Sequence, residues 1–326
     1  MALRWGVLGT GSIAGSMTRD LQGAGLTVAA VGSRSADSAR AFADAHRIPG
    51  AHASYEALCA DPAVDAVYVA TPHPFHAEHA LLAVAHGKHA LVEKPFTMDA
   101  ASARAVFAAA DARGVMVMEA MWTRFLPKLV RIRELVASGA LGEVRAVIAD
   151  HTQSLPTDPE HRLQNPRLGG GALLDLGIYP LTLADDVLGA PTAIAAQADF
   201  TRLGVDRQTG MQFRYDSGAQ AQLLCALDTA GPIRAAIIGT DGSLELDRPW
   251  HEAAAGFTWF DAEHAPVERI PGEQGLRGMH YQALEFERII ASGGRESPIL
   301  PPSVTVRIME TMDRVREQIG LEYPAV

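Results

Sequence analysis

The pattern of apolar and polar positions divides the chain into two parts. In the first part, continuous apolar runs of strand length alternate with helical patterns. The apolar runs are residues 3–9, 26–32, 64–70, 89–92 and 115–118. Such runs suit parallel strands that are covered on both faces, and their alternation with helices predicts a doubly wound parallel sheet of the Rossmann type.

After about residue 121 the pattern changes to longer β-like stretches that follow one another without intervening helices. Met211, Phe213 and Tyr215 alternate with polar residues, which is typical of a strand with one buried face. The stretches are residues 143–153, 192–202, 209–215, 219–228, 233–239 and 244–247, and helices are expected at 127–137, 279–291 and 303–319. We therefore expect an α/β domain over residues 1–121 and an α+β domain over 122–326, built on a mostly antiparallel, open-faced sheet.

Composition narrows the class of protein. The 326 residues carry 28 Lys plus Arg against 38 Asp plus Glu, a formal net charge of −10, which argues against nucleic acid as a partner. The two cysteines, Cys59 and Cys225, each lie in an apolar run and are expected to be buried free thiols. The N-terminus enters a strand directly, and no apolar run reaches the ~18 residues of a membrane span. We expect a cytoplasmic protein with no membrane partner.

The first strand is followed by a glycine turn that opens a helix. The segment GVLGTGSIAGSM contains Gly9-x-Gly11-x-x-Ala14, with alanine where a third glycine is often found. The first glycine permits a tight turn and the second lets backbone approach a pyrophosphate, while the helix N-terminus at Ser12 and Ile13 offers N–H groups to it. In this strand–turn–helix context the pattern predicts dinucleotide binding.

The end of the second strand favours one dinucleotide over the other. NAD binding uses an Asp or Glu here to accept from the ribose 2′-OH, but the sequence has Ser33, Arg34 and Ser35, and its first acid is Asp37. An arginine pairs with a 2′-phosphate. We expect NADP, with NAD and an ordinary surface arginine as the alternative.

The segment HALVEKPF places a charged pair, Glu93 and Lys94, at the end of a buried strand. Ligands of open parallel sheets bind beyond the carboxyl ends of the strands, so we expect both residues beside the nicotinamide. Pro95 keeps Lys94 out of helical dihedral angles. Further cofactor contacts are expected from residues at the ends of the neighbouring strands, namely Thr71, Pro72, His76 and Trp122.

In the second domain, RLGGGALLDLGIYP leads from a glycine turn into a helix. Asp175 and Tyr179 are four residues apart, so they share one helix face and can point into one cleft. The alternative is that Tyr179 is a packed core aromatic and Asp175 a helix-end charge.

These segments, together with ATPHPFHAEHALLAVAHGKHALVEKPF, MEAMWTRFLP and ESPILPP, resemble in order and over nearly the whole chain the glucose–fructose oxidoreductase / inositol dehydrogenase (Gfo/Idh/MocA) family. MALRWG and the tyrosine at 179 resemble the branch that contains dimeric dihydrodiol dehydrogenase and NADP-dependent D-xylose dehydrogenase. Many relatives have histidine at the position of Tyr179, which makes inositol a less expected substrate. The resemblance implies that Lys94 and Tyr179 form a catalytic pair supported by Asp175, and that subunits form a homodimer through the C-terminal sheet.

This pair suits oxidation of an alcohol, in which a hydride leaves carbon while a base takes the hydroxyl proton. A free phenol, with a pKa of about 10, is a poor base near neutrality. An ammonium ~4 Å from a phenol, at an effective dielectric constant of ~20, favours the phenolate by up to about 4 kcal/mol. We expect a hydride transfer between nicotinamide and a cyclic polyol, either an aldose such as D-xylose or a trans-dihydrodiol.

Other candidates carry alternatives of equal or greater weight. Trp122 and Phe125 are expected either as an apolar wall against a substrate ring or as interdomain core. Histidines recur between residues 73 and 89 without a cysteine or acid that completes a ligand set, so no metal is expected. Substrate hydroxyl groups are further expected to contact Arg162, Asn165 and Asp206.

Two other functions stay open at this point. One is a non-catalytic NADP-binding regulator, which would not need both Lys94 and Tyr179. The other is an NAD-dependent glycoside hydrolase on the same fold, with no net redox change.

Overall fold

A computed structural model describes residues 2–324, and the chain divides into two compact units. Unit 1 comprises residues 1–125 and 276–306, and unit 2 comprises residues 126–275 and 307–326. The sequence places a boundary after residue 121 and assigns all later residues to the second domain, whereas the contacts return the segment 276–306 to unit 1.

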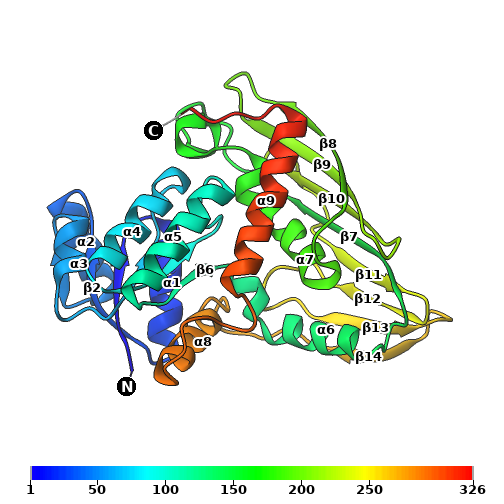
Figure 1. The fold of residues 1–326 in the computed structure, drawn as a ribbon, viewed down its shortest axis with the longest axis horizontal. Coiled ribbons are helices and arrows are strands. Elements are labelled where there is room, and N and C mark those ends of the chain that lie inside the picture. Colours follow the sequence, from blue (N-terminus) through cyan, green and yellow to red (C-terminus); the bar gives the residue numbers. More distant parts are fainter. Residues whose placement is uncertain (1, 325–326) are drawn as a thin grey trace. The chain divides into compact units, whose positions relative to one another are not determined.

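Unit 1 is built on a six-stranded parallel sheet with strand order β3-β2-β1-β4-β5-β6 (Figure 1). This is the order of a dinucleotide-binding Rossmann fold, and it confirms the predicted fold class. The strands are β1 (Arg4–Leu8), β2 (Thr27–Gly32), β3 (Gly50–His52), β4 (Ala66–Val69), β5 (His89–Glu93) and β6 (Val117–Ala120). Short β3, with mixed burial, is the strand for which the sequence has no continuous apolar run.

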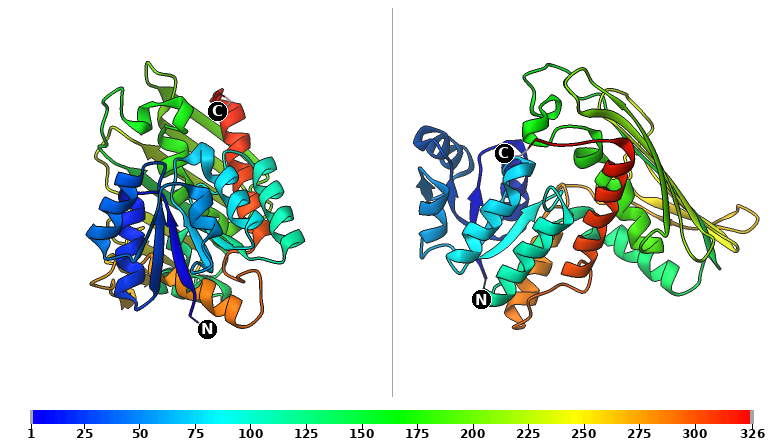
Figure 2. Two further views of the ribbon diagram at one scale, coloured as in Figure 1. Left: turned by 90° about the vertical axis from the view of Figure 1, so that its left-hand side faces the viewer. Right: turned by 45° about the horizontal axis from the view of Figure 1, so that its top comes forward.

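Helices cover both faces of this sheet, as the buried apolar runs require (Figures 1 and 2). Local sequence signals begin several of them: Ser35, Ser54 and Asp99 each accept a hydrogen bond from a backbone N–H in the first turn of the following helix. The helices of unit 1 are α1 (Ser12–Gly23), α2 (Ala36–His46), α3 (Tyr55–Ala60), α4 (His76–Ala85), α5 (Ala100–Arg113) and α8 (His280–Ala291), with 3₁₀ turns η1 (His73–Phe75) and η2 (Trp122–Phe125).

Unit 2 is built on an eight-stranded sheet with order β14-β13-β12-β11-β7-β10-β9-β8. All neighbours are antiparallel except β7 and β10, which are parallel, so the prediction of a mostly antiparallel sheet is confirmed. The strands are β7 (Val144–Thr152), β8 (Ala193–Phe200), β9 (Asp206–Arg214), β10 (Gln220–Ala226), β11 (Ala235–Gly239), β12 (Gly242–Leu246), β13 (Phe257–Asp261) and β14 (Pro266–Ile270). The last two were not expected from the sequence; β14 is largely exposed and lacks an apolar run.

One face of this sheet carries helix α7 (Ile178–Leu188), which contacts β7 and β10 (Figure 1). Burial of the side chains alternates along β7 as a result of this packing. Val147, Ala149 and His151 are buried on the helix side, while Ile148 lies on the opposite face and is 44% exposed. The remaining elements are α6 (Pro127–Ala137), α9 (Pro302–Ile319), the 3₁₀ turns η3 (Arg162–Gln164) and η4 (Pro166–Leu168), and the π-helix η5 (Leu173–Gly177).

Among the helices of residues 2–324, none combines the length and the apolar character needed to cross a lipid bilayer.

Candidate active site

In unit 1, the turn between β1 and α1 has the geometry of a phosphate cradle. Gly9 has φ +113°, and a Cβ there would lie 2.9 Å from the carbonyl oxygen of Ala70, so only glycine fits. Gly11 is the N-cap of α1, and a Cβ there would meet nothing within 4 Å. No side chain caps the helix, and its first turn carries no acidic residue. The open space, the uncapped N–H groups and the positive end of the helix dipole fit a dinucleotide pyrophosphate.

The end of β2 provides the second part of this cradle. Ser33 is buried, whereas Arg34 and Ser35 are exposed, and Ser35 uses its hydroxyl to cap α2. The first acid, Asp37, lies in the first turn of α2. Arg34 is therefore the charged side chain at the position where a ribose 2′-substituent is recognised.

The loops after β4 and β5 are tied together by a histidine. His76 is fully buried, and its ring nitrogens lie 2.8 Å from the carbonyl oxygens of Thr71 and Pro95. Thr71 also bonds His79, with 2.9 Å between its hydroxyl and Nδ1. His76 thus fixes the loop expected to contact the ribose, Thr71 and Pro72, against the loop that carries Lys94.

Buried carboxyl groups hold the turn around Lys94. Glu93 accepts hydrogen bonds from the hydroxyl of Tyr68 and from the backbone N–H of Lys94, the latter at 3.2 Å. On the next strand Glu119 accepts from the backbone N–H of Phe96 and from the hydroxyl of Thr305, both at 3.1 Å. The Lys94–Pro95 peptide bond is cis. Glu93 therefore positions this turn, and Glu119 does so as well, although no motif in the sequence marks it.

Burial raises the pKa of Glu119 to about 7, which makes stability depend on pH. The folded chain binds this proton more tightly than the unfolded chain, so between pH ~4.5 and ~7 unfolding releases a proton and stability falls as the pH rises. We expect Glu119→Gln, which cannot ionise, to gain in free energy of unfolding relative to the wild type between pH 5 and pH 8, measured by urea unfolding at both values.

The control for this prediction is Glu134→Gln, at a side chain that is 60% exposed. It is expected to change the free energy of unfolding by less than about 0.5 kcal/mol at either pH. An equal effect of Glu119→Gln at pH 5 and pH 8 would contradict the prediction.

The aromatic residues after β6 are packed inside the protein. Trp122 and Phe125 keep only 1% and 4% of their exposure, and the guanidinium of Arg277 lies 5.6 Å from the centre of the Trp122 ring. This burial favours the packing role for Phe125, while a contact of Trp122 with cofactor or substrate stays a proposal.

In unit 2, the segment that carries Asp175 and Tyr179 departs from the predicted geometry. The sequence predicts one continuous α-helical face, but Leu173–Gly177 forms a π-helix, and Tyr179 lies in the first turn of α7. The wider turn changes the angle between the two side chains from that of an α-helix. Such π segments occur frequently at functional sites. Arg162 donates to Asp175 across 3.1 Å, and Asp175 is 8% exposed.

Asp206 supports this π-helix from β9. It is fully buried and accepts from the backbone N–H of Leu173 at 2.8 Å and from the hydroxyl of Thr209 at 2.7 Å. Burial raises its pKa to about 7. These bonds give the carboxyl group a structural role, and the substrate contact expected from the sequence stays a prediction. Asn165 likewise uses its side chain locally, accepting from the backbone N–H of Arg167 at 2.9 Å.

Two histidines that carry no local signal of a functional role lie against Tyr179. The ring centre of Tyr179 is 4.8 Å from that of His151 on β7 and 5.5 Å from that of His251, which follows β12. Alternation along β7 does place His151 on the helix side of the sheet, but no local pattern links it to His251. The phenol therefore lies in a polar aromatic cluster rather than in an apolar core.

Comparison with known proteins agrees with this arrangement. Residues 3–121 match the family described as "Oxidoreductase family, NAD-binding Rossmann fold", and residues 129–245 match the "GFO/IDH/MocA C-terminal domain". The chain belongs to the GFO/IDH/MocA oxidoreductase family. The resemblance stated from the sequence is thereby confirmed, and the protein is an oxidoreductase.

Individual family members are similar over their full length. Trans-1,2-dihydrobenzene-1,2-diol dehydrogenase of Bos taurus is 34% identical, covering 99% of both chains. D-xylose 1-dehydrogenase (NADP(+)) of Hypocrea jecorina is 37% identical, covering 99% of this chain and 93% of the relative. Among solved structures, the 3-ketoreductase KijD10 from Actinomadura kijaniata, in complex with NADP and TDP-benzene, is 29% identical with a TM-score of 0.87 and covers 98% of each chain.

Proposed function

We propose that the protein is an NADP-dependent dehydrogenase that oxidises a ring carbinol of a cyclic polyol. The observation that carries this proposal is the uncapped glycine cradle of unit 1, followed at the end of β2 by Arg34 with no acid beside it. The names of the D-xylose and dihydrodiol dehydrogenases among its relatives support a cyclic substrate with hydroxyl groups. When bound, NADP would supply the acceptor for the hydride.

The chain's own residues divide the remaining work. Gly9, Gly11, Ser12 and Ile13 would hold the pyrophosphate through backbone, and Arg34 the 2′-phosphate. In this proposal Tyr179 accepts the hydroxyl proton of the substrate, Lys94 supplies a positive charge that stabilises the reacting oxygen, and Asp175 supports the pair.

The experiment that tests this function is a substrate panel. The purified protein is mixed with NADP or NAD and with D-xylose, D-glucose, inositols or trans-1,2-dihydrobenzene-1,2-diol, and nicotinamide reduction is followed. Reduction with a polyol supports the proposal. Cleavage of a glycoside without net reduction would favour a glycoside hydrolase. Absence of both reactions with retained NADP binding would favour a regulator.

Cofactor preference has its own test in Arg34→Ala. Loss of the guanidinium removes the partner of the 2′-phosphate, so kcat/KM with NADP is expected to fall about 10- to 100-fold, while the value with NAD stays within about threefold. Steady-state kinetics with both cofactors measures this. Arg113→Ala, at an exposed arginine in the last turn of α5, is the control and should leave both values unchanged. An equal loss with both cofactors would contradict the role of Arg34.

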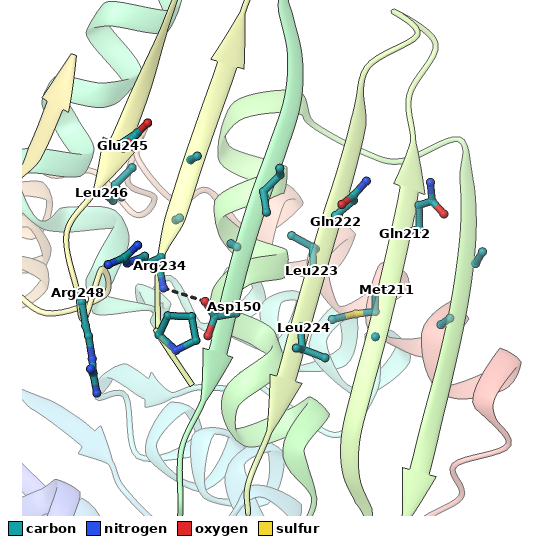
Figure 3. Close-up of a pocket in the computed structure, with 18 of the residues that line it drawn as sticks. Asp150, Met211, Gln212, Gln222, Leu223, Leu224, Arg234, Glu245, Leu246 and Arg248 are labelled. Carbon is teal, nitrogen blue, oxygen red and sulfur yellow. Dashed lines mark hydrogen bonds between the residues drawn. The ribbon is translucent and has the colours of Figure 1, made fainter. Parts of the chain in front are cut away.

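We further propose that unit 2 pairs with a second copy of the chain through the face of its sheet opposite α7. Figure 3 shows this face, where Gln222 and Leu224 lie on the strand next to that of Asp150, and Gln212 lies one strand further from Asp150 and Arg234. Charges of both signs on one face suit a twofold interface, in which each patch meets its own copy. Light scattering should give twice the chain mass, and Ile148→Asp, on the same face, should give the monomer. A monomeric wild type would contradict this proposal.

We also propose that the protein is cytoplasmic. Cys59 and Cys225 are both buried free thiols, as predicted, which supports a reducing compartment such as the cytoplasm.

A further inference from the structure

The ring cluster of unit 2 comprises Tyr179, His151 and His251, which come from three different elements. The two imidazole centres are 4.2 Å apart with an angle of 30° between their planes, and both contact the Tyr179 ring. His151 is 1% exposed, while His251 and Tyr179 keep 4% and 6%. All three side chains are therefore buried, and His251 and Tyr179 keep slightly more exposure than His151.

The orientation of His151 is held by a hydrogen bond. The amide Nε2 of Gln153 lies 2.7 Å from Nε2 of His151. With its orientation set, His151 provides a flat surface on which His251 stacks.

The loop that carries His251 is held by groups that are costly to bury. The Trp250 indole N–H donates to the carbonyl of Asp150 at 2.9 Å. The ammonium of Lys128 donates to the carbonyl oxygens of Glu252 and Ala255 at 2.5 and 2.8 Å. Burial lowers the pKa of Lys128 to about 7, which reflects the cost of placing this charge in the interior. The loop is thus fixed on both sides of His251.

The chemistry of the ring next to Tyr179 bears on the substrate. Apolar rings would be enough if the cluster served packing alone. An imidazole in addition presents a hydrogen-bond donor and an acceptor in fixed directions. An aldose ring carries a hydroxyl group on the carbon next to the reacting one and further hydroxyl groups on the carbons beyond it. A trans-dihydrodiol of benzene carries one neighbouring hydroxyl group, and the rest of its ring is apolar.

We propose that His251, held by the stack on His151, is a specificity-determining residue that hydrogen-bonds a substrate hydroxyl group beyond the one next to the reacting carbinol and makes the enzyme prefer aldoses to trans-dihydrodiols. This inference rests on the proposed function, in which Tyr179 acts on that carbinol. A site built to bond a hydroxyl group discriminates strongly against an analogue that lacks it, because its polar groups are then left buried without a partner.

The test compares D-xylose and trans-1,2-dihydrobenzene-1,2-diol as substrates of the full-length enzyme with NADP. The wild type is expected to favour D-xylose. In His251→Phe, which keeps an aromatic ring, kcat/KM for D-xylose should fall at least about tenfold, largely through KM, while the value for the diol stays within about threefold or rises. His251→Gln, which keeps hydrogen-bonding groups without the ring, should retain more of the preference than His251→Phe.

His86→Phe is the matched control, because it makes the same chemical change at an exposed histidine of unit 1, outside the ring cluster. It should leave kcat/KM for both substrates within about twofold of the wild type. Thermal unfolding of each variant identifies a folding defect. If His251→Phe is defective, the ratio of kcat/KM for the two substrates is measured with His251→Gln instead.

Three outcomes would overturn the inference. One is a wild type that prefers the diol, and another is a His251→Phe variant in which both substrates lose activity equally. In either case nicotinamide reduction by the wild type leaves the proposed function intact. A wild type that reduces no nicotinamide with any polyol would overturn the proposed function and this inference together.

Discussion

Replacement of Tyr179 by phenylalanine is expected to lower kcat at least about 10³-fold while NADP binding stays within about twofold of the wild type. The change removes one oxygen atom and keeps the ring, so the contacts with His151 and His251 are retained. If Tyr179 is the general base, its loss removes proton transfer, which contributes about 10²- to 10⁴-fold in enzymes of this kind. Nicotinamide reduction measures kcat, and fluorescence titration measures NADP affinity.

Tyr215→Phe is the control for this effect. Tyr215 is also a buried tyrosine of unit 2, at 4% exposure, and burial raises the pKa of its phenol. Removing its hydroxyl makes the same chemical change without touching the ring cluster, so kcat should stay within about twofold. Turnover of Tyr179→Phe at the wild-type rate would end the case for Tyr179 as the base.

Replacement of Lys94 by methionine is expected to have an effect of similar size, with kcat lower by about 10³-fold or more. Methionine has nearly the length of lysine but no charge, so the variant tests the ammonium itself. The turn should keep its shape, because Glu93 bonds the backbone N–H of residue 94 and His76 bonds the carbonyl of Pro95. NADP affinity is therefore expected to remain close to that of the wild type.

Lys88→Met separates this effect from the general loss of a lysine in unit 1. The Lys88 ammonium donates to the carbonyl oxygens of Asp61 and Val64 at 2.9 and 2.7 Å, which is a structural role. Its replacement should lower the melting temperature and leave kcat per folded molecule unchanged.

Lys94→Arg should remain poorly active, since a planar guanidinium does not reproduce a compact ammonium. Full activity in Lys94→Met would remove Lys94 from the mechanism.

Much of unit 1 could be predicted from the sequence because its signals are local. Continuous apolar runs mark buried parallel strands, and the caps Ser35 and Asp99 bond N–H groups only three residues further on. The Gly9-x-Gly11 turn is similarly local, since φ and the room for a Cβ are properties of a few neighbouring residues. The glycine cradle and the position of Lys94 at the end of a strand therefore follow from local sequence, whereas the pairing of Lys94 with Tyr179 is implied by the resemblance to the family.

Residues that support these groups could not be found in this way. Glu119 bonds Thr305 across 186 residues of sequence, and His151 stacks on His251, which follows it by 100 residues. Periodicity states which face of a strand is buried, but it does not state which distant side chain packs there. Asp206 illustrates the same limit, because its role depends on the distant Leu173 N–H that it accepts from.

By itself the sequence determined the fold class, the dinucleotide cradle and the residue types available for acid–base chemistry, because each depends on short-range patterns. Only the tertiary structure decided that the segment before Tyr179 is a π-helix and that buried carboxyl groups hold the turn around Lys94. It also decided that two imidazoles pack against the phenol. Those features arise from packing between elements, where the energies of burial and hydrogen bonding depend on partners that no local pattern specifies.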